Sequence, residues 1–339
     1  MKDKFLIILS IVLLLIAPTI ILTQSTNIYI STNGKDANKC TQFSPCRTFN
    51  KVINLAKPGD TIHILKGVYN ETATISKSGA PKDYLSIVGH NAILNGVVVS
   101  GDYVWVSKVE VVGSISHGIL VSGRHIIIQD SSVHHSVTEN GLGPFCNTEG
   151  NESGWGSGIK VERGAENIII RNNKSYENCG EGIVATMGKN VIIDNNISRD
   201  NYSVNIYIDN SYFTTVSNNH IRCTGNGYLR DGRRAAGIAS GEEYYLDWGA
   251  QRHDNNILNN TVDGCYEGIA SWTSKIPEGK EINLLIKNNT VINGTYRSIA
   301  IGWNNQNVLI ENNKIFAPVH VDDTRGVTVL NNTAIGATP

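Results

Sequence analysis

The sequence has few charged residues and no cluster of residues spaced to bind a metal. Charged residues make up only 17% of the 339 residues and the formal net charge is −1, so no basic surface for nucleic acid is indicated. No Cys-x-x-Cys pair or His/Cys cluster has the spacing of a zinc site, and we identify no metal ligand set and no cofactor motif. These absences favour a β-rich body that works without a tightly held cofactor.

A degenerate repeat of about 23 residues runs from roughly residue 167 to the C-terminus. Its clearest copies are 165–188, 189–211 and 282–304. Each copy has an alternating apolar triplet, an Asn-Asn pair, a short β-branched segment, a polar turn and a second strand. A fixed period made of short strands is typical of a solenoid. We predict an all-β, single-stranded parallel β-helix over 60–339, with coils about 4.8 Å apart.

The Asn-Asn pairs mark the same turn in each coil. Three successive pairs begin at Asn172, Asn195 and Asn218, a spacing of 23, and later pairs drift as insertions intervene. We expect their side chains to stack and to hydrogen-bond one another and the backbone, which is a structural role. Most of the nine Asn-x-Ser/Thr sequons, including Asn70 and Asn196, arise from this composition, although export would permit their glycosylation.

The N-terminus indicates export through a membrane. Lys2 and Lys4 precede an apolar run over 5–22, and small residues follow at Thr23 and Ser25. We predict a signal peptide over 1–25. Because about 18 apolar residues also suffice to cross a bilayer, the alternative is an uncleaved anchor. Either way we expect a secreted, extracellular or cell-surface protein.

Six cysteines agree with an exported chain, where disulfides persist. Cys40 and Cys46 bracket a short loop, and stacking of successive coils would bring the others together in pairs. The predicted pairs are Cys40–Cys46, Cys146–Cys179 and Cys223–Cys265. The alternative is that one or two pairs stay reduced.

The segment before the coils has a different pattern. Residues 28–31 read as a strand, and 47–56 read as one amphipathic helix before a Pro-Gly-Asp turn at 58–60. Because a solenoid must shield its terminal coil from edge pairing, we assign 26–59 to a strand and a capping helix that covers the N-terminal end.

This opening resembles that of secreted right-handed parallel β-helix proteins, in the order Tyr-Ile-Ser-Thr-Asn-Gly-Lys-Asp (29–36), capping helix, Pro-Gly-Asp-Thr-Ile (58–62) and Gly-Val-Tyr (67–69). The later coils look like the repeat of pectate-lyase-like and alginate-lyase-like carbohydrate-active proteins. The resemblance implies a right-handed helix and action on a glycan. Only this resemblance points to Ca²⁺ as a cofactor.

The catalytic sets of those relatives are not recognisable here. The Asp-Asp pair and Gly-His-Gly element expected of polygalacturonases are absent, as is the Lys and Arg pair one coil apart of alginate-lyase-like proteins. Where such a lysine would lie, the chain has Arg163, and the next coil offers Thr186 or Met187. The resemblance therefore assigns no catalytic residue.

Strand alternation sorts the residues that follow each Gly-Ile step. An inward aliphatic stack is predicted, with two outward columns beside it. The inward stack is Ile159, Ile183, Ile206, Ile238, Ile269 and Ile299. The first outward column is Leu120, Lys160, Val184, Tyr207, Ala239, Ala270 and Ala300, and the second is Ser122, Glu162, Thr186, Asp209, Gly241, Trp272 and Trp303.

The second column suggests a sugar-binding surface. Trp272 and Trp303 would lie on adjacent coils of one sheet, and exposed indoles are a usual platform for sugar rings. The alternative is that a long loop covers both rings and makes them part of the core.

Two insertions, at about 138–157 and 225–250, flank this face, and long loops on a repeat scaffold often carry function. The second supplies further candidate substrate-binding residues, in which guanidinium groups would pair with uronate carboxylates and rings would stack on sugar: Arg233, Arg234, Tyr244 and Trp248. The alternative is a loop held together by its own Arg–Glu pairs.

These residues favour an enzyme that cleaves an extracellular, acidic polysaccharide. As a lyase it would use Lys160 or Tyr207 as the base. As a hydrolase it would use Glu162 and Asp209, two coils and roughly 10 Å apart. The alternative is a non-catalytic surface or adhesion module that binds glycans through Trp272 and Trp303. In either case we expect a monomer. The missing family catalytic sets favour the module, and the charged column and the insertions favour the enzyme.

Overall fold

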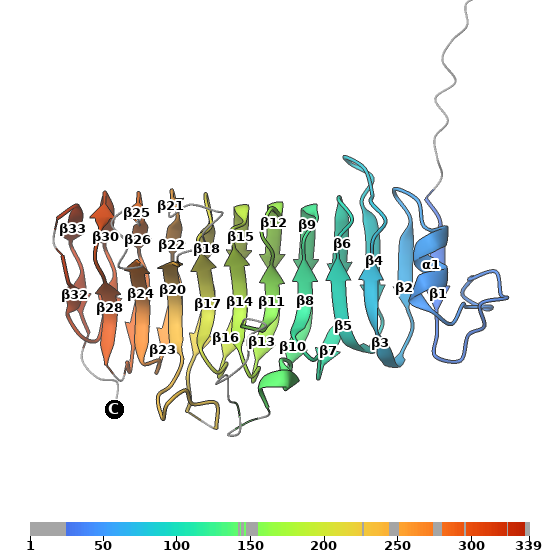
Figure 1. Ribbon diagram of the computed structural model, residues 1–339, viewed down its shortest axis with the longest axis horizontal. Coiled ribbons are helices and arrows are strands. Elements are labelled where there is room, and N and C mark those ends of the chain that lie inside the picture. Colours follow the sequence, from blue (N-terminus) through green and yellow to red (C-terminus); the bar gives the residue numbers. More distant parts are fainter. Residues whose placement is uncertain are drawn as a thin grey trace, which may run out of the picture.

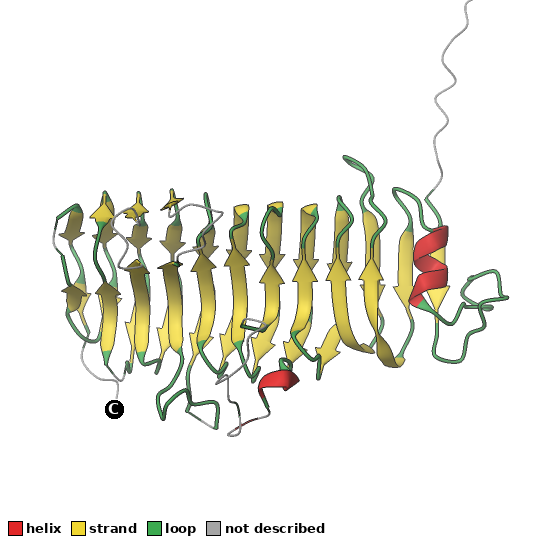
Figure 2. Cartoon of the chain, viewed as in Figure 1, coloured by secondary structure: helices red, strands yellow, loops and turns green. Residues whose placement is uncertain are grey.

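The structure, a computed structural model, describes the chain in nine stretches. They are 25–141, 143, 146, 155–225, 227–243, 251–273, 280–294, 296–323 and 325–335. Within them the chain is an elongated stack of parallel β coils, with a helix at the N-terminal end and β33 at the opposite end (Figures 1 and 2). Among these residues no helix is long and apolar enough to cross a membrane. The predicted signal segment lies almost wholly outside the described residues.

One face of the stack is a 12-stranded sheet in which every pairing is parallel. Its strands, in order, are β1 (Asn27–Ile30), β2 (Thr61–Ile64), β4 (Leu85–Gly89), β6 (Val104–Ser107), β9 (Arg124–Gln129), β12 (Glu166–Arg171), β15 (Lys189–Asp194), β18 (Thr215–Ser217), β22 (Asn256–Leu258), β26 (Leu285–Lys287), β30 (Val308–Glu311) and β33 (Val327–Leu330).

The other strands form a 19-stranded sheet that splits into two ladders after the long strands β3 (Gly67–Ile75) and β5 (Ala92–Val99). The middle ladder continues through β7 (Glu110–Val112), β10 (Ser132–His134), β13 (Lys174–Tyr176), β16 (Ile197–Arg199), β19 (His220–Arg222), β23 (Thr261–Asp263), β27 (Thr290–Ile292), β31 (Lys314–Ile315) and β34 (Thr333–Ala334).

The remaining ladder carries the candidate site, and we call it the site ladder. It continues through β8 (His117–Val121), β11 (Ser157–Val161), β14 (Glu181–Thr186), β17 (Val204–Asp209), β20 (Ala236–Glu242), β24 (Glu267–Thr273), β28 (Arg297–Ile301) and β32 (Val319–Val321). A separate 3-stranded sheet joins β21 (Gln251–His253), β25 (Lys280–Ile282) and β29 (Asn305–Gln306). The predicted parallel β-helix is confirmed.

The inward aliphatic stack is also confirmed. Ile159, Ile183 and Ile206 are fully buried, and each pairs with its counterpart on the next coil. Ile238, Ile269 and Ile299 continue the same column, also fully buried. Each coil therefore contributes a branched side chain to one continuous core that runs along the axis.

A ladder of buried asparagines lines the corner before the middle ladder. The amide nitrogen of each donates to the side-chain oxygen of the next at 2.8–3.1 Å, and this oxygen also accepts from the preceding asparagine's backbone N–H. The members are Asn173, Asn196, Asn219, Asn260, Asn289, Asn313 and Asn332.

The first asparagine of each pair forms the turn. Asn172, Asn195 and Asn218 have φ values of 58°, 53° and 56°, a left-handed conformation that asparagine tolerates better than most residues. The pair thus combines a turn residue with a ladder residue. Three sequon asparagines, Asn173, Asn196 and Asn201, are at most 1% exposed, so the folded chain does not present them to a glycosyltransferase.

The N-terminal end is closed by α1 (Phe49–Leu55), close to the predicted 47–56. Thr48 caps it by accepting a hydrogen bond from the backbone N–H of Lys51. Its apolar side packs into the core, where Phe49 contacts Tyr69 with ring centroids 5.6 Å apart. Because β1 pairs with β2, the stack of strands begins at Asn27 rather than at residue 60.

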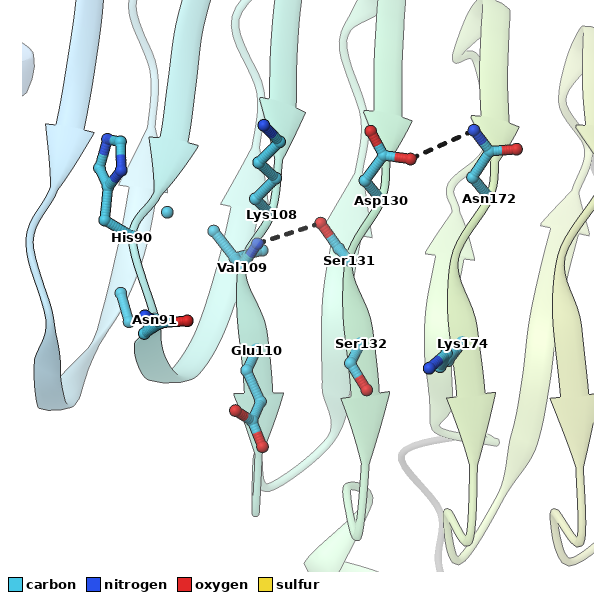
Figure 3. Close-up of a pocket in the computed structure, with 12 residues that line it drawn as sticks. His90, Asn91, Lys108, Val109, Glu110, Asp130, Ser131, Ser132, Asn172 and Lys174 are labelled. Atoms are coloured by element: carbon cyan, nitrogen blue, oxygen red, sulfur yellow. Dashed lines mark hydrogen bonds between the residues drawn. The ribbon is translucent and has the colours of Figure 1, made fainter.

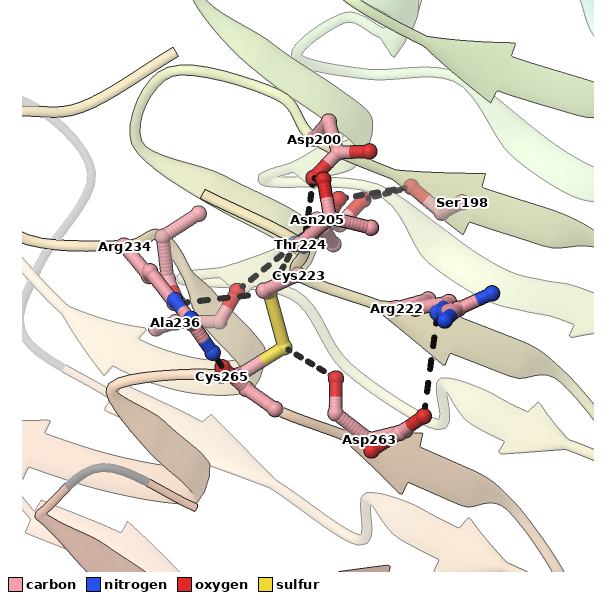
Figure 4. The surroundings of a disulfide bond; sticks show 12 residues. Ser198, Asp200, Asn205, Arg222, Cys223, Thr224, Arg234, Ala236, Asp263 and Cys265 are labelled. Carbon is pink, nitrogen blue, oxygen red and sulfur yellow. Dashed lines mark hydrogen bonds and ion pairs between the residues drawn. A yellow bond between two sulfur atoms is a disulfide. The ribbon is translucent and has the colours of Figure 1, made fainter. Parts of the chain in front are cut away.

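The three predicted disulfides are present: Cys40–Cys46, Cys146–Cys179 and Cys223–Cys265. The last joins neighbouring coils, and Asn205 donates to the Cys223 sulfur at 3.1 Å (Figure 4). Arg234 lies beside this bond, where one guanidinium nitrogen donates to the Gly264 carbonyl at 2.9 Å. The second insertion is therefore fastened to the coils near residue 234.

The aliphatic stack predicts a sharp contrast between two isoleucines. Ile206→Asp would bury an unpaired carboxylate and should lower the free energy of unfolding by about 3–5 kcal/mol. Ile192→Asp, on an outward side chain that is 42% exposed on β15, should change it by less than about 1 kcal/mol. Denaturant unfolding of both variants measures the difference, and equal losses would contradict the inward assignment.

Candidate functional site

The outward columns of the site ladder have the predicted register over most of their length. Lys160 pairs with Val184, and Val184 pairs with Tyr207. In the second column, Thr186 pairs with Asp209, which pairs with Gly241, and Gly241 pairs with Trp272. In-register stacking therefore brings Lys160, Glu162, Tyr207, Asp209 and Trp272 onto one face.

Trp303 is not in the predicted column. Ile301 pairs with Ser271, so Gly302 lies opposite Trp272, and Trp303 falls one residue further along, after β28 has ended. The Thr273 hydroxyl donates to the Trp303 carbonyl at 2.9 Å, which fixes this offset. The assignment to one column was wrong, but both indoles line the same hollow on this face.

The two central residues are less exposed than expected. Tyr207 and Asp209 are only 4% and 5% exposed. The Tyr207 ring contacts Trp272 with centroids 5.3 Å apart and belongs to an outer apolar cluster with Val184 and Val204. Residues of an outward column are expected to be reachable by solvent, and for Tyr207 and Asp209 this expectation is wrong, because neighbouring side chains cover this part of the column.

Glu181 is the residue that simple alternation missed. Counting back from the inward Ile183 would place residue 181 inside the coil. Gly182 breaks this count, because a Cβ there would point at Ser198 and Asn201, which are buried within the coil. Two consecutive positions thus face inward, and Glu181 is turned onto the outer face. The sequence signal for this change of direction is Gly182 itself, the glycine of the Gly-Ile step.

These side chains surround a cleft of about 380 Å³ over β11, β14 and β17. Its lining combines carboxylates, cations and rings from several coils with Glu243 at the end of β20 and Trp155 before β11. The members are Trp155, Lys160, Glu162, Arg163, Glu181, Thr186, Met187, Ser203, Val204, Tyr207, Asp209, Arg230, Glu243 and Trp272.

Glu181 has a strongly perturbed pKa. Burial and the negative charges of Asp209 and Glu243 raise its pKa from 4.5 to about 8, against the opposing effects of Lys160 and of a 3.2 Å hydrogen bond from the Ser157 hydroxyl. Glu181 is therefore protonated and neutral at pH 7. A neutral carboxyl beside other carboxylates is the arrangement by which enzymes keep a proton donor available.

Tyr207 and Glu243 form the other side of this acidic centre. The Tyr207 hydroxyl donates to a Glu243 carboxylate oxygen at 2.8 Å, and Asn210 exchanges two 2.8 Å hydrogen bonds with the Glu243 backbone. Burial, together with the charges of Asp209 and Glu243, raises the pKa of Tyr207 well above its ordinary value. Tyr207 is therefore a hydrogen-bond donor at neutral pH and is poorly suited to be a base.

The opposite rim is aromatic and cationic. Trp155 stacks near Tyr202 with centroids 6.5 Å apart, and the Arg230 guanidinium lies 4.5 Å from the centre of the Trp155 ring. Arg230 also donates to the Ser203 hydroxyl at 3.3 Å. Of the arginines predicted to bind substrate, Arg233 lies over the Tyr266 ring and Arg234 lies near a disulfide, and neither lines the cleft. Tyr244 and Trp248 lie outside the described residues.

A second hollow of about 470 Å³ lies where the 12-stranded sheet turns into the middle ladder (Figure 3). Lys108, Asp130 and Asn172 occupy successive coils there, in turns with φ values of 57°, 52° and 58°. Asn172 donates to Asp130 at 3.1 Å, and no Trp, Tyr or Phe lines the hollow. It is a groove between rows of turn residues and does not combine rings with a buried acid as the cleft does.

Within the part of the chain that the structure describes, no group of three or more His, Cys, Asp or Glu side chains could hold a metal ion. The acidic residues of the cleft therefore do not fit the Ca²⁺ that the family resemblance suggests, and we derive no step through calcium.

The protonated Glu181 predicts how stability depends on pH. Between 4.5 and about 8 the folded state keeps a proton that the unfolded state has released, so the free energy of unfolding should fall as the pH rises through this range. Glu181→Gln cannot ionise and should flatten this fall, whereas Glu162→Gln on the half-exposed neighbour should not. Thermal unfolding midpoints measured across the range decide it, and parallel curves for all three proteins would refute the assignment.

The sequence and the fold can be compared with known proteins. YwoF, an uncharacterized protein of Bacillus subtilis, is 26% identical over 88% of this chain and 69% of its own length. Pectate lyase L of Dickeya chrysanthemi is 23% identical over 69% of this chain, and the match spans 64% of that enzyme, slightly under two thirds.

Among solved structures, an alginate lyase from Paenibacillus sp. str. FPU-7 has a TM-score of 0.61 at 15% identity, covering 91% of this chain and 99% of its own. PfbA, a surface adhesin of Streptococcus pneumoniae, has a TM-score of 0.62 at 13% identity, covering 81% and 82%. These two likenesses show the fold alone. The family described as "Pel9A-like, right handed beta helix region" matches residues 28–207, more than half of the sequence, and the chain belongs to this family.

Proposed function

We propose that the chain is an exported enzyme that cleaves a polysaccharide in the cleft beside Glu181. The observation that carries this proposal is a neutral, buried carboxyl group that shares a hollow with Asp209 and with aromatic rings. Burying a charged carboxylate without a partner is costly, and here protonation of Glu181 avoids that cost. Two carboxyl groups held in different protonation states are typical of acid–base catalysis on glycosidic bonds.

Hydrolysis uses this pair directly. Glu181 donates its proton to the glycosidic oxygen as the bond to the anomeric carbon breaks, and Asp209 faces the positive charge that develops on the sugar ring. Water then supplies the hydroxyl group at the anomeric carbon, and its remaining proton restores Glu181 or passes to solvent. Glu181 and Asp209 lie on neighbouring coils, at opposite ends of the paired strands β14 and β17, whereas Glu162 lies two coils from Asp209. Because the charge of Asp209 raises the pKa of Glu181, we pair Glu181 rather than Glu162 with Asp209.

The aromatic side chains hold the substrate in this scheme. Trp155 and Trp272 both line the cleft, and indole rings are suited to contact the apolar face of a sugar. The Tyr207 ring contacts Trp272 and limits its movement. The hydrogen bond from Tyr207 to Glu243 holds the end of β20 against β17. Three cations, Lys160, Arg163 and Arg230, add positive charge at the rim.

A second candidate reaction is β-elimination from a uronate. Pectate lyase L, a curated relative, is named for such an activity, and Lys160 places an amine in the cleft near Glu181. In this reaction Lys160 takes the proton next to the uronate carboxylate, and the neutral Glu181 donates a hydrogen bond to that carboxylate. The sugar–oxygen bond then breaks to leave an unsaturated ring, and the departing oxygen takes up the proton that Lys160 removed, directly or through water.

The location outside the cytosol is part of the same proposal. Three disulfides fasten loops to the coils, and such bonds persist in oxidising compartments. An extracellular protein of this fold would meet its polysaccharide directly.

Purified protein incubated with pectin, alginate, glycosaminoglycans and neutral glycans separates the alternatives. New reducing ends without absorbance near 235 nm indicate hydrolysis, and both signals together indicate elimination. Glu181→Gln should lower kcat by about 10²–10⁴-fold for hydrolysis, because glutamine cannot transfer a proton, and by much less for elimination, where its amide still donates a hydrogen bond. Parent activity should decline above about pH 8 as Glu181 ionises. Lys160→Ala should be comparably damaging only for elimination.

Glu166→Gln, on β12 of the 12-stranded sheet and outside both the cleft and the other hollow of the site ladder, is the control and should retain the parent kcat. Binding of a glycan without cleavage by any protein in the series would contradict the enzymatic proposal. It would instead support a non-catalytic module, a role compatible with the fold because PfbA is a surface adhesin.

A further inference from the structure

A third hollow lies on the site ladder, next to the cleft on its C-terminal side. It has a volume of about 220 Å³ and lies over β24 and β28. We call it the trough, and Trp272 lines both it and the cleft, so the two hollows are adjacent. Its lining is Glu267, Ala270, Ser271, Trp272, Thr273, Arg297, Ala300, Ile301, Gly302, Trp303 and Asp322.

The trough exists because small residues replace large ones in both outward columns. After Tyr207 the first column continues with three alanines, Ala239, Ala270 and Ala300. In the second column Gly302 follows Trp272, so no side chain stands beside that ring on the next coil. Repeated small residues on successive coils lower the floor along the helix axis and leave the flanking side chains as walls.

The walls of the trough differ in character. One is formed by the indoles of Trp272 and Trp303, and Trp303 is 59% exposed although it is a large apolar ring. The other is formed by Glu267 and Arg297, which pair across adjacent strands with their charged groups 3.8 Å apart. An exposed indole above an alanine floor, facing a polar wall, matches a sugar ring with its apolar face and polar rim.

The charges of the trough discriminate between sugars. Arg297 is the one cation among the described residues that line it, and its guanidinium is already engaged with Glu267 and lies 4.4 Å from the centre of the Tyr296 ring. Asp322 adds a second carboxylate and is itself in contact with His320 at 2.9 Å. A uronate carboxylate placed here would meet two acidic side chains and no uncommitted guanidinium, so uncharged sugars are favoured.

The two hollows together are long enough for an oligosaccharide. From β11 to β28 the ladder takes five steps, through β14, β17, β20 and β24. At the spacing of neighbouring strands this distance is roughly 24 Å. A chain bound along the axis would thus place one part at Glu181 and a distant part between the two indoles.

We propose that the trough is a remote subsite that binds uncharged sugar units of the polysaccharide held in the cleft, stacked against Trp272 and Trp303. This inference rests on the proposed function for the direction of the chain, but its binding chemistry is separate from catalysis. It also restricts the substrate: elimination would require a mixed polymer in which uronate in the cleft is followed by neutral sugars.

The test measures binding without turnover, in protein that carries Glu181→Gln. Xylo-oligosaccharides from the dimer to the hexamer serve as neutral probes, oligogalacturonides of the same lengths serve as acidic probes, and calorimetry gives the dissociation constants. We expect affinity for the neutral series to rise with length until the trough is filled. Trp303→Ala should then weaken the hexamer by about tenfold and leave the dimer unchanged. Ala300→Leu, which raises the floor, should do the same.

Phe43→Ala is the matched control, since this ring is 95% exposed in the N-terminal segment, away from the trough, and its loss should change no dissociation constant. Equal losses for dimer and hexamer, an equal gain with length for the acidic series, or no binding of the neutral series would overturn the inference. Residual cleavage by the Glu181→Gln protein would count against the proposed catalytic role alone. The two ideas can therefore fail independently.

Discussion

The hydrogen-bonded register between successive coils is the constraint on which the rest of the structure depends. A parallel strand that slipped by one residue would exchange its inward and outward side chains, so the aliphatic stack and the outer columns exist only together. The asparagine ladder holds this register at one corner, because each amide satisfies the backbone and side chain of a neighbouring coil. Losing that register would disperse the core and the cleft at the same time.

The same register explains how a repetitive scaffold produces a site that is not repetitive. Lys160, Val184 and Tyr207 occupy equivalent positions on successive coils, yet they present an amine, an apolar group and a phenol. Because the backbone repeats, chemical differences between coils become a spatial pattern along the axis. The acid-rich cleft and the alanine-floored trough are two parts of this pattern, separated by the Tyr207–Trp272 contact.

Residues from the two insertions enclose the side chains that the register places in the cleft. Glu243 lies where β20 leads into the second insertion, and it reaches back to Tyr207 on the previous coil. Arg230 and Trp155 approach from the two loops that bound the opposite rim. Enclosure by these residues removes water from around Glu181, and this desolvation is the main cause of its raised pKa. Residues around the cleft thereby influence the protonation state of the proposed acid.

The sequence by itself determined the repeat, the inward isoleucines, the capping helix and the cysteine pairs, because period, alternation and composition are local properties of the chain. The role of Glu181 and the position of Trp303 required the tertiary structure. A glycine bend turns the former outward, and the end of β28 displaces the latter by one residue. Alternation describes an ideal strand, and both residues lie at strand ends, where contacts between coils rather than local sequence fix the direction of a side chain.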